Sequence, residues 1–316
     1  MINYRKIIGS KNLRILILSA LSWVPDKLML YIQYYLQTGM KLHLKNPKTF
    51  NEKLQAYKLY YRNPKMLNCT DKIEVRKYIE KKGFRDILVP LHKIIENLDE
   101  YNIAELPDKF VAKTSDGGGG NQILIYRNKK NLNIEEVKKT FRQWSRAPKP
   151  VKHVAREWAY DNGFPRKILI EQLLENDDPQ NKEIDDYKFF CFDGKFKILW
   201  IDKNRYSDHR RGFWNEKLEF LNEVKCLYPT FAQPPVLPDN IKEMIKIAET
   251  LSEGFPFVRI DLYNVNNKIY FSEMTFYPNS GYAPFHPLSF DQQLGLFFDY
   301  PKKKNNKSKG FKSSLQ

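Results

Sequence analysis

The chain has 316 residues, of which 42% are hydrophobic and 14% aromatic, and this composition excludes a chain that is disordered throughout. The formal net charge is +16, but residues 1–65 hold twelve Lys and Arg against two acids, and residues 301–316 hold six Lys and no acid. The neutral segment between them argues against a basic adaptor for nucleic acid. The basic ends suit an anionic membrane surface or a polyanion.

The cysteines Cys69, Cys191 and Cys226 are far apart and match no zinc-ligand spacing, which indicates a reducing compartment without a disulfide framework. The apolar run at residues 13–21 has nine residues, whereas a membrane span needs about 20. It is predicted to be a buried or interfacial helix. We therefore expect a cytoplasmic protein, with peripheral contact to the inner face of the plasma membrane left open.

The first part of the chain is predicted to be helical. Residues 10–62 have a mostly helical pattern, and residues 70–83 form a further helical segment with Thr70 as a candidate N-cap and Gly83 at its end.

Four consecutive glycines, Gly117–Gly120, lie between strands predicted at 109–113 and 121–126. Glycine destabilises regular structure by roughly 0.5 to 1 kcal/mol relative to alanine, so the run predicts a loop that needs positive φ, close approach or motion. A mobile loop whose N–H groups hold phosphate needs all three, although neither a P-loop nor a GxGxxG pattern is present. A flexible hairpin tip is the alternative.

The rest of the chain up to residue 300 is predicted to be strand-rich. Residues 239–254 have helical spacing that ends at a glycine, and residues 301–316 are predicted to be disordered. Further strands are predicted at 167–172, 187–192, 195–201, 256–263 and 268–274. The strands between residues 100 and 200 follow one another as antiparallel neighbours rather than as βαβ units.

The segment FVRIDLYNVNNKIYFSEMTF at 257–276 carries the strongest chemical signal. Alternation puts Arg259 and Asp261 on one strand face, and a three-residue loop at 265–267 brings Glu273 to the same face. An ordinary ion-pair cluster is one interpretation. A magnesium site is the other, in which one or two carboxylates join the phosphates of a nucleotide.

Four motifs in this order resemble the TupA-like branch of ATP-grasp proteins, known from teichuronopeptide and other surface-polysaccharide gene sets. They are KTFNEKLQAYKL, LPDKFVAKT, DYKFFCFDGK and the hairpin above. The resemblance covers residues 45–295 and implies an α+β ATP-grasp fold with two α+β lobes that grip a nucleotide. The implied parts are a basic helical region at 1–65, an ATP-grasp domain at 66–300 with a small lobe at 109–172 and a large lobe at 173–300, and a basic tail at 301–316.

ATP and Mg²⁺ are the implied cofactors. Lys113 matches a strand lysine at the α and β phosphates, Lys72 matches a second lysine that reaches them, and Gly117–Gly120 match the closing loop. Lys72 is also predicted in the first turn of its helix, where a cation costs roughly 0.3 to 1 kcal/mol unless an anion lies nearby. An exposed lysine in solvent is the alternative.

The resemblance also implies the adenosine contacts. Glu171 matches the acid that accepts from the adenine amino group, and backbone groups of Gln172 and Leu173 complete adenine recognition. Asp186 matches the acid on the ribose hydroxyls, with its neighbour Asp185 as an alternative.

The catalytic cations implied in the same way are Lys188, Arg259 and Arg205. Lys188 points toward the phosphates, Arg259 stabilises the transferring phosphoryl group, and Arg205 lies in a loop that closes over the γ-phosphate. Arg210 and Arg211 compete for the role of Arg205.

Asp261 and Glu273 match the two magnesium-binding carboxylates. Many ATP-grasp proteins have Asn two residues after the glutamate, where this chain has Thr275, whose hydroxyl can still bind a hard cation. Ser280 and Gly281 lie where a substrate carboxylate approaches.

The implied activity is ATP-dependent carboxylate–amine ligation through an acyl phosphate. The expected partners are ATP, a small amine or amino acid, and a uronic acid of a bacterial surface polysaccharide or its lipid-linked precursor. A glycosyltransferase that uses Asp185 and Asp186 for a metal is the alternative, and it needs a βαβ order that the chain does not show.

Overall fold

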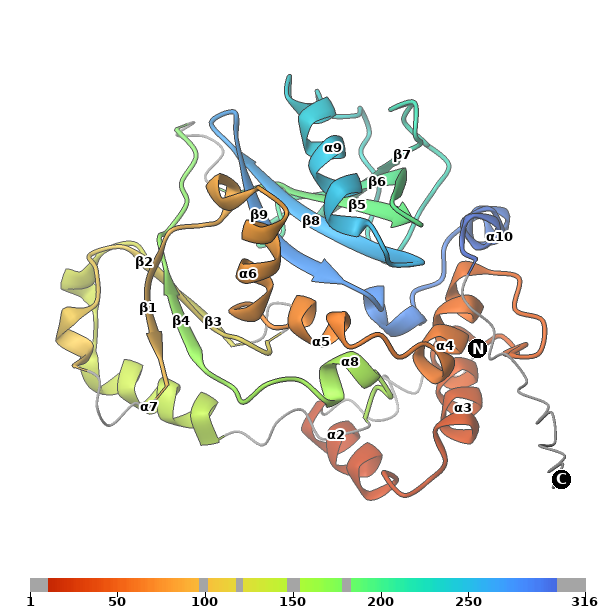
Figure 1. Cartoon of the computed structure of the whole chain (residues 1–316), viewed down its shortest axis with the longest axis horizontal. Coiled ribbons are helices and arrows are strands. Elements are labelled where there is room, and N and C mark those ends of the chain that lie inside the picture. The colour runs from red at the N-terminus through yellow and green to blue at the C-terminus, as the bar shows by residue number, and fades with distance from the viewer. Residues whose placement is uncertain (1–10, 97–101, 118–121, 147–153, 178–182, 300–316) are drawn as a thin grey trace, which may run out of the picture.

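Two antiparallel sheets organise the chain, with helices packed on each of them (Figure 1). The computed structural model describes residues 11–96, 102–117, 122–146, 154–177 and 183–299. The helices are α2 (Lys11–Ala20), α3 (Asp26–Thr38), α4 (Phe50–Tyr60), α5 (Lys65–Thr70), α6 (Glu74–Lys81), α7 (Ile134–Arg146), α8 (Trp158–Asp161), α9 (Ile241–Ser252) and α10 (Leu288–Phe297). The strands are β1 (Leu91–Ile95), β2 (Phe110–Thr114), β3 (Ile123–Tyr126), β4 (Ile168–Glu171), β5 (Asp186–Phe192), β6 (Lys195–Lys203), β7 (Arg210–Trp214), β8 (Phe257–Val265) and β9 (Lys268–Thr275).

The larger sheet has the strand order β7-β6-β5-β8-β9 and holds the main core. Every residue of β5 is buried, because helices cover both faces of the strand. On one face α9 packs on β5, β6 and β8. On the opposite face the ring of Phe50 in α4 lies 5.8 Å from that of Phe190 and 4.8 Å from that of Phe257. Lys188 and Arg259 share this second face, since side chains alternate along each strand.

The smaller sheet has the order β1-β4-β2-β3 and its own apolar cluster. Phe110 on one face packs with Val137 and Phe141 of α7. The other face carries Lys113 and Glu171. Figure 1 shows α5 and α6 between the two sheets, so this polar face looks toward the larger sheet.

The N-terminal helices pack against the C-terminal one. A capping box starts α4, in which Thr49 and Glu52 exchange backbone and side-chain hydrogen bonds. Asn51 of α4 then donates from its backbone N–H (3.1 Å) and its side-chain amide (2.9 Å) to the buried carboxylate of Asp291 in α10. These contacts join segments 240 residues apart.

The apolar run at 13–21 is a helix, as predicted, but it is not buried. In α2 the side chains of Leu13, Leu16 and Ile17 are exposed to solvent. Among the described residues, no helix is long and apolar enough to cross a membrane.

Six elements were not predicted: β1, β7, α5, α7, α8 and α10. β1 and β7 each lie at one edge of their sheet, and the strands at the opposite edges, β3 and β9, were predicted. Charged residues interrupt the apolar alternation in the sequences LHKII and RRGFW, and this alternation is the pattern by which strands are recognised.

Two local predictions were wrong. The β8–β9 connection has two residues, Asn266 and Asn267, rather than three. Both adopt positive φ (52° and 61°), the conformation of a type I′ hairpin turn.

The other wrong prediction is the N-cap of the helix after residue 70. Thr70 ends α5, and Asp71 performs the capping, since its Oδ1 accepts from the N–H groups of Ile73 (2.8 Å) and Glu74 (3.0 Å). Lys72 therefore precedes α6 and does not lie in its first turn.

Candidate active site

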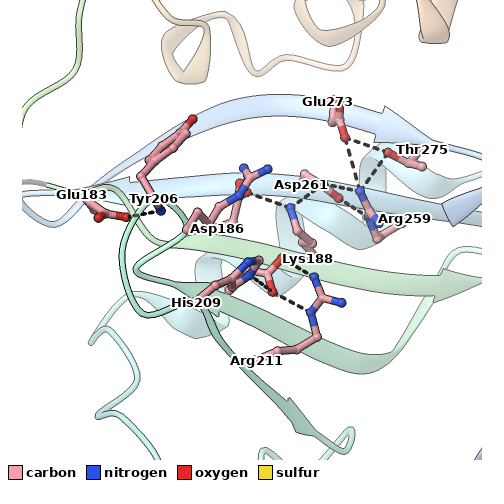
Figure 2. A network of polar contacts seen from close by, with 12 residues as sticks. Glu183, Asp186, Lys188, Tyr206, His209, Arg211, Arg259, Asp261, Glu273 and Thr275 are labelled. Carbon is pink, nitrogen blue, oxygen red and sulfur yellow. Dashed lines mark hydrogen bonds and ion pairs between the residues drawn. The ribbon is translucent and has the colours of Figure 1, made fainter. Parts of the chain in front are cut away.

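Arg259, Asp261 and Glu273 lie on one face of the β8–β9 hairpin, as the alternation predicted (Figure 2). The register places Asp261 opposite Glu273. The guanidinium of Arg259 contacts both oxygens of Asp261, Nε to Oδ1 and Nη2 to Oδ2, at 2.6 Å each, and its Nη2 lies 3.3 Å from Oε1 of Glu273. One buried guanidinium thus bridges two carboxylates.

The neighbouring strand β5 adds Lys188 and Asp186 to this group. Lys188 Nζ lies 3.0 Å from Asp261 Oδ2 and 2.9 Å from Asp186 Oδ2. Burial disfavours the ammonium ion, but the two carboxylates outweigh burial and raise the pKa of Lys188. Figure 2 shows the resulting row of alternating charges across β5, β8 and β9.

Glu273 is the carboxylate of this row that meets solvent. Its side chain is 35% exposed, whereas that of Asp261 is 1% exposed. Burial acts to raise the pKa of Glu273, but Arg259, Lys72 and Lys188 together lower it to about 2. Glu273 is therefore ionised at neutral pH and keeps oxygen lone pairs open toward the space between the sheets.

The donor set fits a magnesium ion held together with phosphate. Thr275 Oγ1 donates to Glu273 Oε1 (3.1 Å) and accepts from Arg259 Nη2 (3.2 Å), so a hydroxyl oxygen lies beside the Glu273 carboxylate. Within the described ranges, no cluster of three or more His, Cys, Asp or Glu residues can hold a metal by itself. Mg²⁺ needs only one or two protein carboxylates when a nucleotide supplies further oxygens.

The smaller sheet contributes a second charged group. Glu171 Oε2 lies 2.6 Å from Lys113 Nζ, and its Oε1 lies 3.6 Å from Arg76 Nη1. The N–H of Gln172 donates to the carbonyl of Pro90 (2.9 Å), so this backbone group is engaged within the protein. Leu173 is buried directly after it.

Lys72 lies where the two charged groups approach each other. Its backbone N–H donates to the carbonyl of Ser115 (2.9 Å), and its ammonium group contacts the carbonyl of Gly117. Burial lowers the pKa of Lys72, with Glu273 acting in the opposite direction. Lys72 thus lies close to Glu273 of the larger sheet as well as to the glycine loop. Gly118, Gly119 and Gly120 lie outside the described residues.

The basic loop between β6 and β7 is held against Asp186. Arg205 contacts the Asp186 carboxylate, while Asp185 pairs with Lys203 at 2.7 Å. Of the two neighbouring acids, Asp186 is therefore the one that lies with Lys188. Arg205 is the one loop arginine of the three candidates that touches this group.

The other two candidates are engaged elsewhere. Arg210 pairs with the exposed Asp208 at 2.9 Å. Arg211 is buried, contacts both oxygens of Asp202 at 2.7 and 3.2 Å, and lies over the ring of Trp200.

Ser280 and Gly281 follow β9 and pack on α4. The amide of Gln55 donates to both of their carbonyls, at 3.0 and 2.9 Å. A Cβ on Gly281 would lie 2.9 Å from Cβ of Leu54, and its φ is +64°, so packing alone requires glycine there. The hydroxyl of Ser280 donates to Glu157.

Two residues of this region had not been singled out from the sequence, Lys58 and Glu157. Lys58 Nζ is fully buried, donates to the carbonyl of Ser280 (2.8 Å) and lies 3.8 Å from Glu157 Oε1. Burial lowers the pKa of Lys58 to about 8 and raises that of Glu157. Lys58 stands in the motif KTFNEKLQAYKL, but its partners come from distant segments, and no local pattern reveals them.

The comparison with protein families decides the identity of the fold. The model of the family described as TupA-like ATPgrasp matches residues 52–299. The chain belongs to this family. Within the described residues, the pairings between the strands β1–β9 are all antiparallel and do not have the βαβ order that the glycosyltransferase alternative needs.

Three of the solved structures similar to this TupA-like ATP-grasp protein are those of ligases. D-alanine–D-alanine ligase from Bacillus anthracis is 17% identical over 66% of this chain and 57% of its own, with a TM-score of 0.40. The same ligase complexed with ATP is 15% identical over 66% and 55%, with a TM-score of 0.38. L-amino acid ligase from Bacillus licheniformis is 13% identical over 82% and 55%, with a TM-score of 0.42. The chain thus spans little more than half the length of these ligases, and no curated protein matches it.

Proposed function

We propose that this protein is an ATP-dependent, ADP-forming carboxylate–amine ligase that uses Mg²⁺. The observation that carries the proposal is the arrangement around Lys72, which lies beside Glu273 of the larger sheet and the glycine loop of the smaller one. Cations from both sheets, together with the partly exposed carboxylate of Glu273, suit a metal-bound triphosphate. We also propose that the two sheets are the cores of the two lobes that grip it.

Each charged residue has a proposed task. Lys72 and Lys113 bind the α and β phosphates, and Glu171 with the backbone of Gln172 and Leu173 binds adenine. Asp186 binds the ribose, and Lys188, Arg205 and Arg259 stabilise charge on the transferring phosphoryl group.

Glu273, Asp261 and Thr275 would hold the magnesium ion. Glu273 is the foremost ligand, because both oxygens of Asp261 already contact Arg259. When bound, Mg²⁺ supplies charge neutralisation on phosphoryl oxygens.

The reaction is proposed to run in two steps. A carboxylate oxygen of the acceptor attacks the γ-phosphorus, the bond from this phosphorus to the β,γ-bridging oxygen breaks, and ADP leaves. An amine nitrogen then attacks the acyl carbon, phosphate leaves, and the nitrogen releases a proton. The glycine loop Gly117–Gly120 is proposed to exclude water from the acyl phosphate. Ser280 and Gly281 mark the side from which the acceptor enters.

The proposed acceptor is a uronic acid of a surface polysaccharide or its lipid-linked precursor, and the amine is an amino acid or a small amine. The support is the resemblance to proteins of surface-glycan gene sets, together with the basic ends of the chain. These ends would concentrate the protein at the cytoplasmic face of the membrane, where a polyanionic lipid-linked precursor would lie.

The test is incubation with ATP, Mg²⁺ and pairs drawn from amino acids and uronic acids, with release of ADP and phosphate as the readout. Hydroxylamine in place of the amine should yield a hydroxamate from any activated carboxylate. ADP formation that requires both a carboxylate and an amine supports the ligase. If ATP binds but no uronic acid stimulates ADP formation, the acceptor is a different carboxylate. If ATP does not bind, the ligase proposal is wrong.

A further inference from the structure

Helix α3 is apolar on both of its sides. Met29, Leu30 and Tyr34 are buried against the body of the protein. Leu28, Ile32 and Tyr35, spaced i, i+4 and i+7 on the opposite side, are 53%, 44% and 58% exposed. A surface helix normally places polar residues there, and a helix that is apolar all round is normally covered on all sides.

The exposed apolar side continues into the preceding helix. Leu13, Leu16 and Ile17 of α2 lie at i, i+3 and i+4 and are exposed, Leu16 to 65%. Trp23 in the turn between the helices is 78% exposed. We call these side chains of α2, the turn and α3 the α2–α3 face. Figure 1 places both helices at one edge of the molecule, away from both sheets.

The α2–α3 face is attached firmly to the body. The buried guanidinium of Arg156 donates to the carbonyls of Leu21 (2.8 Å) and Ser22 (3.2 Å) in the turn and to Asp26 Oδ1 (2.9 Å). The exposed position of Trp23 is therefore fixed by buried hydrogen bonds.

The segment of the chain that carries the face is almost entirely positive in charge. Across residues 11–51, Asp26 is the sole acidic residue, and it pairs with Arg156. The same stretch holds the basic residues Lys11, Arg14, Lys27, Lys41, Lys45 and Lys48. An apolar face with exposed Trp and Tyr, carried by a segment rich in basic residues, has the composition of helices that lie in the interface of an anionic bilayer.

We propose that the α2–α3 face docks the protein onto an anionic lipid bilayer, with α2 and α3 lying in the headgroup region. This inference rests on the proposed location of the protein at a membrane and does not depend on the ligase chemistry. It assigns the contact to apolar side chains of two ordered helices, in addition to the attraction of the basic ends.

Hydrogen bonds connect the α2–α3 face to the side of the candidate site from which the acceptor is proposed to enter. Tyr282 Oη donates to Gln33 Oε1 of α3 (2.8 Å), directly after Ser280 and Gly281. The amide of Gln33 donates in turn to the carbonyl of Val154 (2.8 Å). A substrate carried on a lipid in the bound membrane would thus meet the protein on the side where Ser280 lies.

The experiment is sedimentation of the full chain with phosphatidylcholine vesicles that contain or lack phosphatidylglycerol. The wild type should bind vesicles with phosphatidylglycerol, and brominated lipid should quench the fluorescence of Trp23. Trp23→Phe should keep most of the binding and lose the quenching. The double variant Leu16→Ser/Leu28→Ser should bind these vesicles at least about tenfold more weakly, since each substitution removes a leucine side chain that would be buried in the lipid.

The matched control is Leu296→Ser/Val236→Ser, which changes apolar side chains that are 84% and 95% exposed elsewhere on the protein. This control should bind vesicles like the wild type. Equal vesicle binding by Leu16→Ser/Leu28→Ser and wild type overturns the proposal. So does a wild-type dimer that this variant converts to a monomer, since a second copy would then cover the face. ATP binding, measured on the same variants, reports on the candidate active site separately.

Discussion

Glu273 and Asp261 have different environments, although the sequence predicts both of them as magnesium ligands on the same face of the hairpin. Glu273 is partly exposed, whereas Asp261 is enclosed by Arg259 and Lys188. Glu273→Gln is therefore expected to reduce ATP turnover by about 100-fold or more while leaving the unfolding midpoint nearly unchanged.

Steady-state ADP release and urea unfolding check this expectation. Glu253→Gln, at an exposed glutamate that pairs with Lys82, is the control and should retain full turnover. Asp261→Asn should lose turnover and also about 3 kcal/mol of unfolding free energy, because the buried cations Arg259 and Lys188 each lose an ionised partner. Normal turnover in Glu273→Gln would remove this residue from the catalytic group.

Asp291 is expected to make stability depend on pH. Burial raises its pKa to about 6 from 3.8, against the opposing hydrogen bonds from Asn51. The folded protein therefore holds a proton that the unfolded chain has already released between these pH values. The stabilising contribution is complete below pH 3.8 and is lost as the pH rises through about 6, by about 3 kcal/mol in total.

Urea unfolding of the wild type and of Asp291→Asn at pH 4 and pH 7 tests this sign. The unfolding free energy of the wild type should fall relative to that of the variant as the pH rises from 4 to 7. A difference between the two proteins that is the same at every pH does not affect this comparison. A difference between the two proteins that does not change with pH would show that Asp291 titrates normally.

At the scale of residues, sequence reasoning was effective where neighbours in space are also neighbours on one hairpin. Alternation places Arg259 and Asp261 on one face, and Glu273 joins them because a β-bulge between Asp261 and Leu262 shifts the register set by the two-residue turn. The bulge itself was not predicted. Lys58, Glu157 and Ser280 were beyond such reasoning, because their contact depends on how three distant segments pack. The roles given to each residue stay predictions.

At the scale of elements, the contact of α10 with the start of α4 depends on a glycine. A Cβ on Gly295 would lie 3.0 Å from the carbonyl carbons of Lys48 and Thr49, and closer still to the oxygen of Lys48. These are backbone atoms that cannot rotate away. Gly295→Ala is expected to cost about 2 to 3 kcal/mol of unfolding free energy.

Gly163→Ala provides the comparison, since the nearest atoms to its new Cβ would be 3.7 and 3.8 Å away. Its unfolding free energy, measured in urea, should stay within about 0.5 kcal/mol of wild type. Equal stability of the two variants would mean that α10 moves away from α4 at little cost.

The elements missed from the sequence differ in kind. The outer strands β1 and β7 were hidden by polar residues, which is a physical limit of pattern reading. Helix α7, in contrast, could have been predicted from the sequence. Ile134, Val137, Phe141 and Trp144 have the spacing i, i+3, i+7 and i+10 of an amphipathic helix, and Val137 and Phe141 are buried in the apolar cluster of the smaller sheet. The order of the larger sheet, β7-β6-β5-β8-β9, depends on long-range pairing that no local pattern contains.

At the scale of the whole molecule, the chain passes between the two sheets more than once. After α7 it returns to the larger body, where Ala159 lies in the main core and Lys58 donates to the carbonyl of Ala155, and it then re-enters the smaller sheet as β4. The first exit, at Pro90, and the final return, at Gln172, are adjacent, since the N–H of Gln172 donates to the carbonyl of Pro90. Lys72 is a further link, on the side where ATP is proposed to bind. Lys72→Met is expected to weaken ATP binding by about tenfold or more, because a charged hydrogen-bond donor is lost.

Calorimetry of ATP binding in the presence of Mg²⁺ measures this effect, and amide exchange in β2 should slow when ATP binds to the wild type. Lys77→Met, at a lysine whose side chain is 74% exposed, is the control and should bind ATP normally. Unchanged affinity in Lys72→Met would show that this lysine only fastens the glycine loop.

The bond between Asn51 and Asp291 has a consequence for biosynthesis. Helix α4 emerges from the ribosome before its partners Phe257 and Asp291, which are translated 200 residues after Tyr57 and 240 residues after Asn51. Until then the apolar sides of α3 and α4 have no native cover, and the nascent chain is a substrate for chaperones that hold exposed hydrophobic segments. Productive folding of the larger body thus waits for the synthesis of α10, whereas β2, β3, α7 and β4 can assemble before α10 is made.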